Sequence, residues 1–269
     1  MIVPFAAGGT FDVMGRIIAV RMSELLGQQV VVENTTGAGG IIGVTRVVNA
    51  PPDGYTILLG STGTHAYNQT IYKKRRYDAV NDFTPVTLFS EQPMVLVVRK
   101  DLPVSNIPEF AALLNSTIGV NVTHVPYRGS APASNDLIGG QIDYLCGNLG
   151  AAAPLITGKQ VKAIAVLSKG RSPLMPELAS AHEQGLTGMD ITTWTAIFLP
   201  KGAPKAIVDK LNEVTHATME TPVIKSRMLE IGVTGVAPDR RSPEYLAQFV
   251  ADEVARWEGP IKAGGLQVD

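Results

Sequence analysis

A glycine-rich turn near the start of the chain has the residue types of an anion-binding site. Residues 2–5 form a short apolar run that predicts a strand, Gly8, Gly9 and Thr10 predict a turn, and residues 12–26 predict an apolar helix. The first amides of a helix have no partner within it and lie at its positive end. The turn therefore predicts that an anion binds to backbone N–H groups, a chemistry that needs no catalytic side chain.

Asp12 is the acidic residue in the first turn of this predicted helix. In a structural interpretation, its carboxylate complements the helix dipole or caps the turn. In a functional interpretation, it contacts an ammonium group of the ligand or an ordered water. An ionised Asp12 would repel a ligand carboxylate, so direct contact between the two is not expected.

Two more turns rich in small hydrogen-bonding groups follow predicted strands, at residues 61–65 (STGTH) and 127–130 (YRGS). Ligands of open α/β sheets bind beyond the carboxyl ends of the strands, so we expect the three turns to line one site. His65 stands at a strand-to-helix junction and is a candidate ligand contact. Arg128 either clamps a carboxylate or forms a surface ion pair. Because the turns contain no evident nucleophile–base pair, they favour small-ligand binding over catalysis.

A second group of glycines matches a dinucleotide-binding fingerprint only in part. Gly37, Gly39 and Gly43 have nearly the spacing of G-x-G-x-x-G, but the third glycine comes one place late. The next predicted strand ends in Gly60 and Ser61, where a dinucleotide site has an acid. The sequence also has no P-loop, no G-x-S-x-G and no H-E-x-x-H motif. These features disfavour nucleotide, hydrolase and zinc-protease sites.

The histidines and the cysteine do not indicate a metal site. The four histidines lack metal-ligand spacing, and a lone cysteine excludes an internal disulfide and a cysteine-based metal site. We expect Cys146 to be a small buried residue, His124 to be structural or at the rim of the site, and His182 and His216 to be solvated on helices. No metal and no cofactor is expected.

The composition is that of a folded protein with a substantial core. The chain has 269 residues, of which 45% are hydrophobic and 17% charged, with a net charge of -1. This length suits one large domain or two small ones. The near-zero charge argues against nucleic acid as a partner, since that partner demands a basic surface. No run of about eighteen apolar residues occurs, so the sequence predicts no membrane span.

Short apolar strands alternate with helices along most of the chain, which implies a sheet covered on both faces. The predicted strands are residues 2–5, 30–33, 56–59, 83–89, 94–98, 122–125, 142–145, 163–167 and 192–199. The predicted helices are residues 12–26, 41–48, 107–114, 132–138, 150–156, 205–219, 222–231 and 243–262.

Several short motifs, in their order and joint presence, resemble one family along the whole chain. They are IVPFAAGGTFD (2–12), LGQQVVVEN (26–34), GAGG (37–40), PDGYT (52–56), DFTPV (82–86), VPYRG (125–129), LPKGAP (199–204) and VDKLN (208–212). The chain is similar to the periplasmic solute-binding proteins of tripartite tricarboxylate transporters, the TctC or Bug family.

This resemblance implies an α/β, two-lobed, periplasmic-binding-protein-like (type II) fold. Each lobe would be a mostly parallel sheet flanked by helices, with crossover strands at residues 94–99 and 193–199. Lobe 1 would comprise residues 1–98 and 195–269, and lobe 2 residues 99–194. Family ligands are small carboxylates held largely by backbone amides and ordered waters. Carried over to this chain, the ligand-binding residues are Phe5, Ala7, Gly8, Gly9, Thr10 and Asp12, supported by Thr62, Thr64 and His65, with Tyr127 and Arg128 from the third turn.

The function that the resemblance implies is that of a non-enzymatic receptor. It would capture a dicarboxylate, tricarboxylate, aromatic acid or amino acid by lobe closure and deliver it to membrane transporter subunits. We expect a monomer that works in the periplasm. Because the chain begins inside a strand and shows no signal peptide, we expect a mature or trimmed form. The alternatives are an α/β enzyme that uses the same cleft, perhaps on a nucleotide, and a ligand sensor in signalling.

The chain departs from the family pattern in two places. After the helix matching residues 107–114, the family has another strand and a glycine- and serine-rich loop that supplies the second half of the carboxylate clamp. Here Leu114 and Asn115 run almost directly into residues 120–125. We favour residues left out of this sequence over a genuine deletion, because loss of a strand would expose unpaired edges. In addition, Gly147 stands before Asn148 where the family often has an acid, which would change the rim of the site.

Overall fold

The computed structural model describes residues 1–116, 127, 130–265 and 267, and they form two compact units. Unit 1 contains Met1–Glu91, Trp194–Met228 and Thr234–Asp269, and unit 2 contains Gln92–Thr193 and Leu229–Val233. Two strands, β4 (Phe83–Arg99) and β7 (Thr192–Pro200), continue from one unit into the other. The lobe limits expected from the resemblance, 98/99 and 194/195, remain a prediction.

The sheet of unit 1 is mixed. Its strand order is β2-β1-β3-β7-β4, and β8 pairs with β4. β1 is parallel to β2 and β3, whereas β7 is antiparallel to β3 and β8 is antiparallel to β4. Besides β4 and β7, the strands are β1 (Ile2–Val3), β2 (Glu33–Asn34), β3 (Leu58–Ser61) and β8 (Thr234–Gly235).

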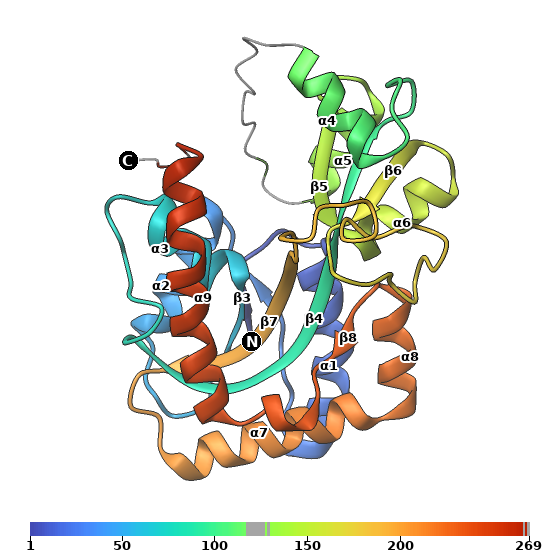
Figure 1. Ribbon diagram of the computed structural model, residues 1–269. Helices are drawn as coiled ribbons and strands as arrows, with labels where there is room; N and C mark the ends of the chain where they lie inside the picture. The colour runs from blue at the N-terminus through green and yellow to red at the C-terminus, as the bar shows by residue number, and fades with distance from the viewer. Residues whose placement is uncertain (117–126, 128–129, 266, 268–269) are drawn as a thin grey trace. The chain divides into compact units, whose positions relative to one another are not determined.

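Helices cover both faces of this sheet (Figure 1). On one face, α1 (Thr10–Leu26) packs against α7 (Lys205–Glu220) and buries Met14, Ile18 and Met22. On the other face, one hydrophobic core joins side chains of α2, β3, β7 and α9. The elements on that side are η1 (Ala38–Gly40), α2 (Ile41–Val48), η2 (Gly63–Tyr67), α3 (Asn68–Ile71) and α9 (Pro243–Ala263). The remaining elements of this part of the chain are α8 (Pro222–Glu230) and η3 (Pro238–Arg240).

Unit 2 is built on the second half of β4. Antiparallel to it lie β5 (Tyr144–Asn148) and β6 (Val161–Val166). Leu96 and Val98 pack with Phe110, while Val95 and Val97 pack on the opposite face. The helices are α4 (Ile107–Ser116), α5 (Ser130–Ile138) and α6 (Leu149–Thr157). Each unit therefore has its own core, as expected for alternating strands and helices.

Most predicted elements are present within a few residues of their expected bounds, but β4 is a correction. Residues 83–89 and 94–98 are not two strands but parts of one strand of 17 residues. Pro93 does not break it because β4 changes partners there. Ser90 and Glu91 pair with β8, and the pairs with β5 begin at Met94. A proline without a ladder hydrogen bond is tolerated at such a position.

Five single-residue or strand expectations also change or go untested. Cys146 is exposed, not buried; it lies on β5, which among the described strands is the last in the sheet order and pairs only with β4. His182 is exposed but lies in a turn. His216 is half-buried in α7, where its Nε2 lies 3.0 Å from Thr87 Oγ1, so it is not solvated as expected. His124 and the strand at 122–125 lie outside the described residues.

The close approach of α2 to the neighbouring backbone explains Gly43. A Cβ on Gly43 would lie 2.6 Å from the carbonyl oxygen of Thr35 and 3.1 Å from Cβ of Pro4. Only a glycine lets the helix pack this closely. The partial dinucleotide fingerprint is thus accounted for by helix packing, one of the roles that glycines have in such motifs.

We predict that Gly43→Ala lowers the free energy of unfolding, although alanine is the better helix former by about 1 kcal/mol. The added methyl group forces the backbone near Thr35 or Pro4 to shift. Gly259→Ala in α9 is the matched control, because a Cβ there meets no described atom within 4 Å. It should raise stability by about 0.5–1 kcal/mol. Urea denaturation measures both, and a Gly43→Ala protein as stable as the Gly259→Ala protein would contradict the packing argument.

Candidate functional site

The N-terminus of α1 lies on the surface of unit 1 directly after the Gly8-Gly9 turn. Gly9 is the N-cap and has no side chain to satisfy the first amides of the helix. By helix geometry, the N–H groups of Thr10, Phe11 and Asp12 have no partner within α1. Phe5 and Phe11 stack across the turn with their ring centroids 4.5 Å apart. These amides and the positive end of the helix dipole form a local site suited to an anion.

The Asp12 carboxylate holds this turn in shape. Its Oδ2 accepts a hydrogen bond from Gly8 N at 2.8 Å, and its Oδ1 accepts one from Arg16 Nε at 2.9 Å. Arg16 also donates to Asn34 Oδ1, and Asn34 donates to the carbonyl of Phe5. The geometry is that of the capping interpretation. The Gly8 amide donates to Asp12, so the amides left for an anion are those of the first turn of α1.

The ionised form of Asp12 is favoured by its partners. Burial opposes ionisation, but the hydrogen bonds from Arg16 and Gly8 outweigh it, so the pKa of Asp12 lies below its usual value. The carboxylate therefore stays charged across the physiological pH range. Arg16 beside it offsets that charge, which reduces its repulsion of an anion bound at the helix end.

The second predicted turn lies near the first. A Cβ on Gly40 would lie 2.9 Å from Cγ2 of Thr64 and 3.3 Å from Cβ of Pro4, so this glycine is bordered by the second turn and by the residue that follows β1 and leads into the first. The two threonine side chains of this turn are already paired within unit 1. Thr62 Oγ1 accepts from Trp194 N at 2.8 Å, and Thr64 Oγ1 accepts from Ser61 N at 3.0 Å. These threonines brace the loop after β3.

His65 belongs to an aromatic cluster in the core. Its ring stacks on Phe198 with centroids 3.9 Å apart and contacts Phe83, while Nδ1 lies 2.9 Å from Thr64 Oγ1. The side chain is fully buried, and burial lowers its pKa to about 3, so the imidazole is neutral. The ring packs on the hydrophobic side of the sheet and not at a surface, and the ligand contact expected of His65 stays a prediction.

The third predicted turn belongs to unit 2 and is described only in part. Tyr127 Oη donates to Asp136 Oδ2 of α5 at 2.7 Å, which raises the pKa of the tyrosine. Arg128 and Gly129 lie outside the described residues. The structure thus places the segments that lead from β1 and β3 into the first two turns in the same sheet of unit 1, and the contribution of Tyr127 and Arg128 stays a prediction.

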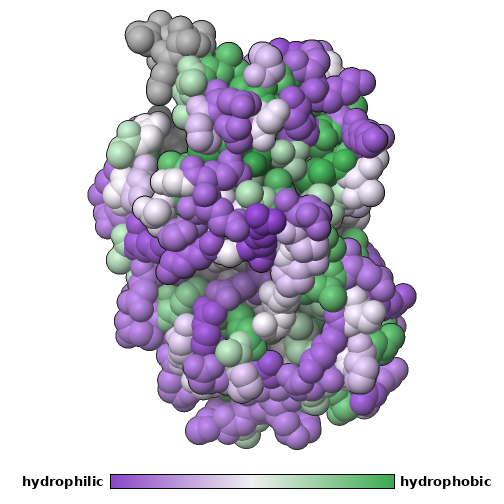
Figure 2. Space-filling model, turned by 45° about the vertical axis from the view of Figure 1, so that its right-hand side comes forward, coloured by the Kyte–Doolittle hydropathy of each residue, from purple (hydrophilic) through white to green (hydrophobic). Residues whose placement is uncertain are grey.

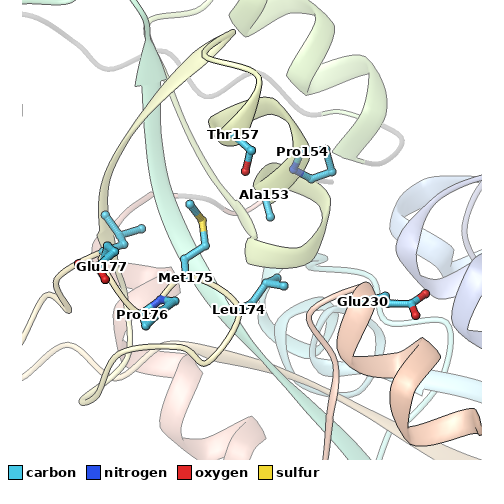
Figure 3. Close-up of a pocket in the computed structure, with 9 residues that line it drawn as sticks. Ala153, Pro154, Thr157, Leu174, Met175, Pro176, Glu177 and Glu230 are labelled. Atoms are coloured by element: carbon cyan, nitrogen blue, oxygen red, sulfur yellow. The ribbon is translucent and has the colours of Figure 1, made fainter.

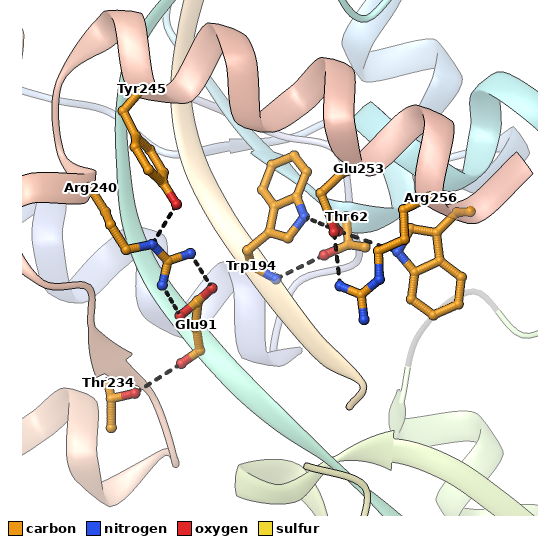
Figure 4. A network of polar contacts seen from close by, with 9 residues as sticks. Thr62, Glu91, Trp194, Thr234, Arg240, Tyr245, Glu253 and Arg256 are labelled. Atoms are coloured by element: carbon orange, nitrogen blue, oxygen red, sulfur yellow. Dashed lines mark hydrogen bonds and ion pairs between the residues drawn. The ribbon is translucent and has the colours of Figure 1, made fainter. Parts of the chain in front are cut away.

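Two polar networks that the sequence did not reveal anchor the crossing strands in unit 1 (Figure 4). Where β7 enters, Trp194 Nε1 donates to Glu253 Oε2 of α9 at 2.9 Å. Where β4 leaves, Glu91 pairs with Arg240 through two contacts of 2.7 Å. Arg240 also donates to Tyr245 Oη. These partners lie 59 and 149 residues apart, so no local pattern indicates them.

Hollows elsewhere on the two units do not include the turns. In unit 2, a hollow of about 560 Å³ is lined mostly by apolar residues of α6 and of residues 174–178 (Figure 3). In unit 1, one of about 620 Å³ lies beside Met1, Tyr55 and Ile207. On the face shown in Figure 2, hydrophobic residues lie interspersed among hydrophilic ones. Within the described ranges, no group of acids, histidines and cysteine is arranged to hold a metal, and no helix is long and apolar enough to cross a membrane.

Comparison with known proteins relates the chain to transport receptors. It matches the family described as tripartite tricarboxylate transporter family receptor (TctC) over residues 14–116 and 110–266. MatC (Rpa3494) from Rhodopseudomonas palustris, solved with bound malate, is 36% identical, with a TM-score of 0.89 over 96% of this chain and 97% of that one.

Two further solved structures agree with this relation. The periplasmic binding protein BugD is 36% identical, with a TM-score of 0.89 over 99% of this chain and 97% of that one. Rpa4515 of R. palustris, solved with adipate, is 33% identical, with a TM-score of 0.90 over 98% of this chain and 96% of that one. These likenesses confirm the predicted family and the α/β periplasmic-binding-protein fold.

We predict that Asp12→Asn destabilises the protein by about 1–2 kcal/mol at pH 7, because one amide oxygen cannot serve both Gly8 and Arg16. The folded-state pKa of Asp12 is lowered, so its stabilisation is present above the unfolded pKa of about 3.9 and is lost as the pH falls below it. Denaturation of both proteins between pH 7 and pH 3 should show the difference shrinking.

Arg16→Gln is the control for this prediction. It removes the ion pair but leaves the Gly8 bond, and Arg16 is 56% exposed, so its loss should cost less than that of Asp12→Asn. An equal or larger cost for Arg16→Gln would show that the ion pair, and not the turn bond, carries the stabilisation.

Proposed function

The chain belongs to the tripartite tricarboxylate transporter receptor family, and we propose that it is a periplasmic solute-binding protein that captures a small carboxylate. It would deliver this ligand to the membrane subunits of a transporter. The observation that carries the proposal is the unpaired N-terminus of α1, held open by Asp12, in a family whose solved members include one with malate and one with adipate.

The turn recognises charge without a cationic side chain. Backbone amides at a helix N-terminus are rigid donors aimed at one point, and the helix dipole adds to their attraction for an anion. Ordered water can bridge the remaining distance at little enthalpic loss compared with a direct hydrogen bond. Phe5, Ala7, Gly9 and Thr10 would shape this site in unit 1, while Gly8 and Asp12 keep it rigid.

Several features support a receptor over an enzyme. His65 is neutral and buried, Asp12 has both carboxylate oxygens bonded within unit 1, and Thr64 is bonded to its own loop. The described residues of the two turns thus offer neither a general base nor an activated nucleophile. The second unit would supply the rest of the clamp, with Tyr127 and Arg128 as candidates, and a monomer suffices for this role.

We predict that malate or adipate stabilises the protein against heat, whereas nucleotides do not. A ligand at a hundred times its Kd adds about 2.7 kcal/mol to the unfolding free energy. For a chain of this size, that corresponds to a Tm increase of about 5–10 °C. Thermal-shift measurements with malate, adipate, citrate, benzoate and glutamate cover the expected classes. Stabilisation by nucleotides and by none of these carboxylates would overturn the proposal.

The variant Thr10→Pro tests the backbone site directly. Proline removes the amide hydrogen at the first position of α1, where proline is well tolerated in helices. We expect the affinity for the stabilising carboxylate to fall about tenfold, which corresponds to about 1.4 kcal/mol, the size of a charge-assisted hydrogen bond. Thr10→Ala keeps the amide and removes the side chain, so it should bind as the wild type does. Calorimetric titration of both would contradict a backbone site if only Thr10→Ala lost affinity.

A further inference from the structure

Among the buried hydroxyl groups of unit 1 that have no hydrogen-bond partner in the part of the chain that the structure describes, two lie on neighbouring strands of the sheet. They are Ser61 Oγ at the end of β3 and Thr195 Oγ1 in β7, on side chains that are 1% and 0% exposed. A third buried hydroxyl, Ser90 Oγ of β4, has only the sulfur of Met14 at 3.6 Å, which is a weak acceptor. Buried hydroxyls normally have a hydrogen-bond partner, so these three hydroxyls call for an explanation.

The pairing register puts Ser61 and Thr195 side by side. They are directly opposite each other in the antiparallel β3–β7 ladder, so their side chains project from the same face of the sheet. Leu59, two residues before Ser61, shares that face. A Cβ on Gly15 of α1 would lie 3.5 Å from Leu59 Cδ2, so this is the face that α1 covers.

The same geometry places the two hydroxyls beside the first turn of α1. β1, α1 and β2 form a parallel strand–helix–strand unit, so α1 runs back along the sheet, opposite to β1 and β3. From Leu59 to Ser61 the strand advances about 6.6 Å. From Gly15 back to Phe11, the helix covers about 6 Å in the same direction. Ser61 and Thr195 are therefore level with the unpaired amides at the start of α1.

We propose that Ser61 and Thr195 recognise the ligand: their hydroxyls donate to the carboxylate held at the start of α1, or to the water bound to it. This inference rests on the proposed function and adds two residues that the sequence motifs did not indicate. Hydroxyl donors suit an anion because they add hydrogen bonds without adding charge. The neighbouring Thr62 and Thr64 oxygens are already engaged by Trp194 N and Ser61 N.

The two hydroxyls are closed to solvent, so the ligand reaches them only when the residues around them move. Leaving them unpaired without ligand costs stability, and pairing them returns that free energy as affinity. The stability of the ligand-free protein and its affinity for the ligand should therefore change in opposite directions, which a purely structural role of the hydroxyls does not predict. Removal of either hydroxyl should leave the ligand-free protein as stable or more stable, and should weaken binding.

The test uses Ser61→Ala and Thr195→Val, which remove the hydroxyls with little change of shape. We expect each variant to have an unchanged or higher Tm without ligand and about a tenfold weaker affinity for malate or adipate, whichever binds the wild type. Thr218→Val in α7 is the matched control. Its hydroxyl is also buried without a described partner, but it belongs to α7 and not to β3 or β7. Its removal should therefore change the Tm and leave the affinity for the carboxylate unchanged.

Each result decides one of the two proposals. If the wild type binds no carboxylate, the proposed function fails. If the wild type binds and both variants bind equally well, the roles of Ser61 and Thr195 are refuted while the receptor function stands. A lower Tm in both variants without ligand would show internal partners and would also refute the inference. Thr195→Ser and Ser61→Thr keep a hydroxyl and should retain affinity, which guards against a general packing defect.

Discussion

The turn between β1 and α1 must leave amides unpaired and still keep one shape. The Asp12 carboxylate meets this demand by bonding Gly8 and Arg16, so that the turn is held from inside the chain. Through Arg16 and Asn34 the same network reaches the carbonyl of Phe5. Asp12, a charged residue whose position first suggests ligand contact, therefore supports the turn whose backbone amides we propose as the binding site.

The two faces of the sheet in unit 1 carry different kinds of side chains around the elements that follow this turn. On one side of the sheet, Ser61 of β3 lies opposite Thr195 of β7, on the face that α1 covers. On the other side, the His65–Phe198 stack packs into a core that reaches α9. Polar groups that would be chemically active in water are thus buried, neutral or paired. A receptor that binds and releases its ligand unchanged has no need of them.

Much of the fold was predictable because its signals are local. The strand–glycine–helix pattern at the start of the chain, the periodic C-terminal helices and the short apolar strands all indicate elements within about ten residues of sequence. The predictions that went wrong depend on neighbours. Cys146 is exposed on β5, which has one partner among the described strands. β4 continues through Pro93, where its partners change, and His216 contacts Thr87 across 129 residues.

The sequence by itself determined the family, the fold class and the position of the glycine-rich turn before α1, since backbone propensities and glycine spacing are properties of short segments. Only the tertiary structure decided which side chains remain available there. In the folded chain, Asp12 and Thr64 accept hydrogen bonds from the backbone of their own loops. The His65 ring is buried against Phe198, and Ser61 lies opposite Thr195. Burial and hydrogen-bond pairing arise between residues that meet only after folding, so no local pattern encodes them.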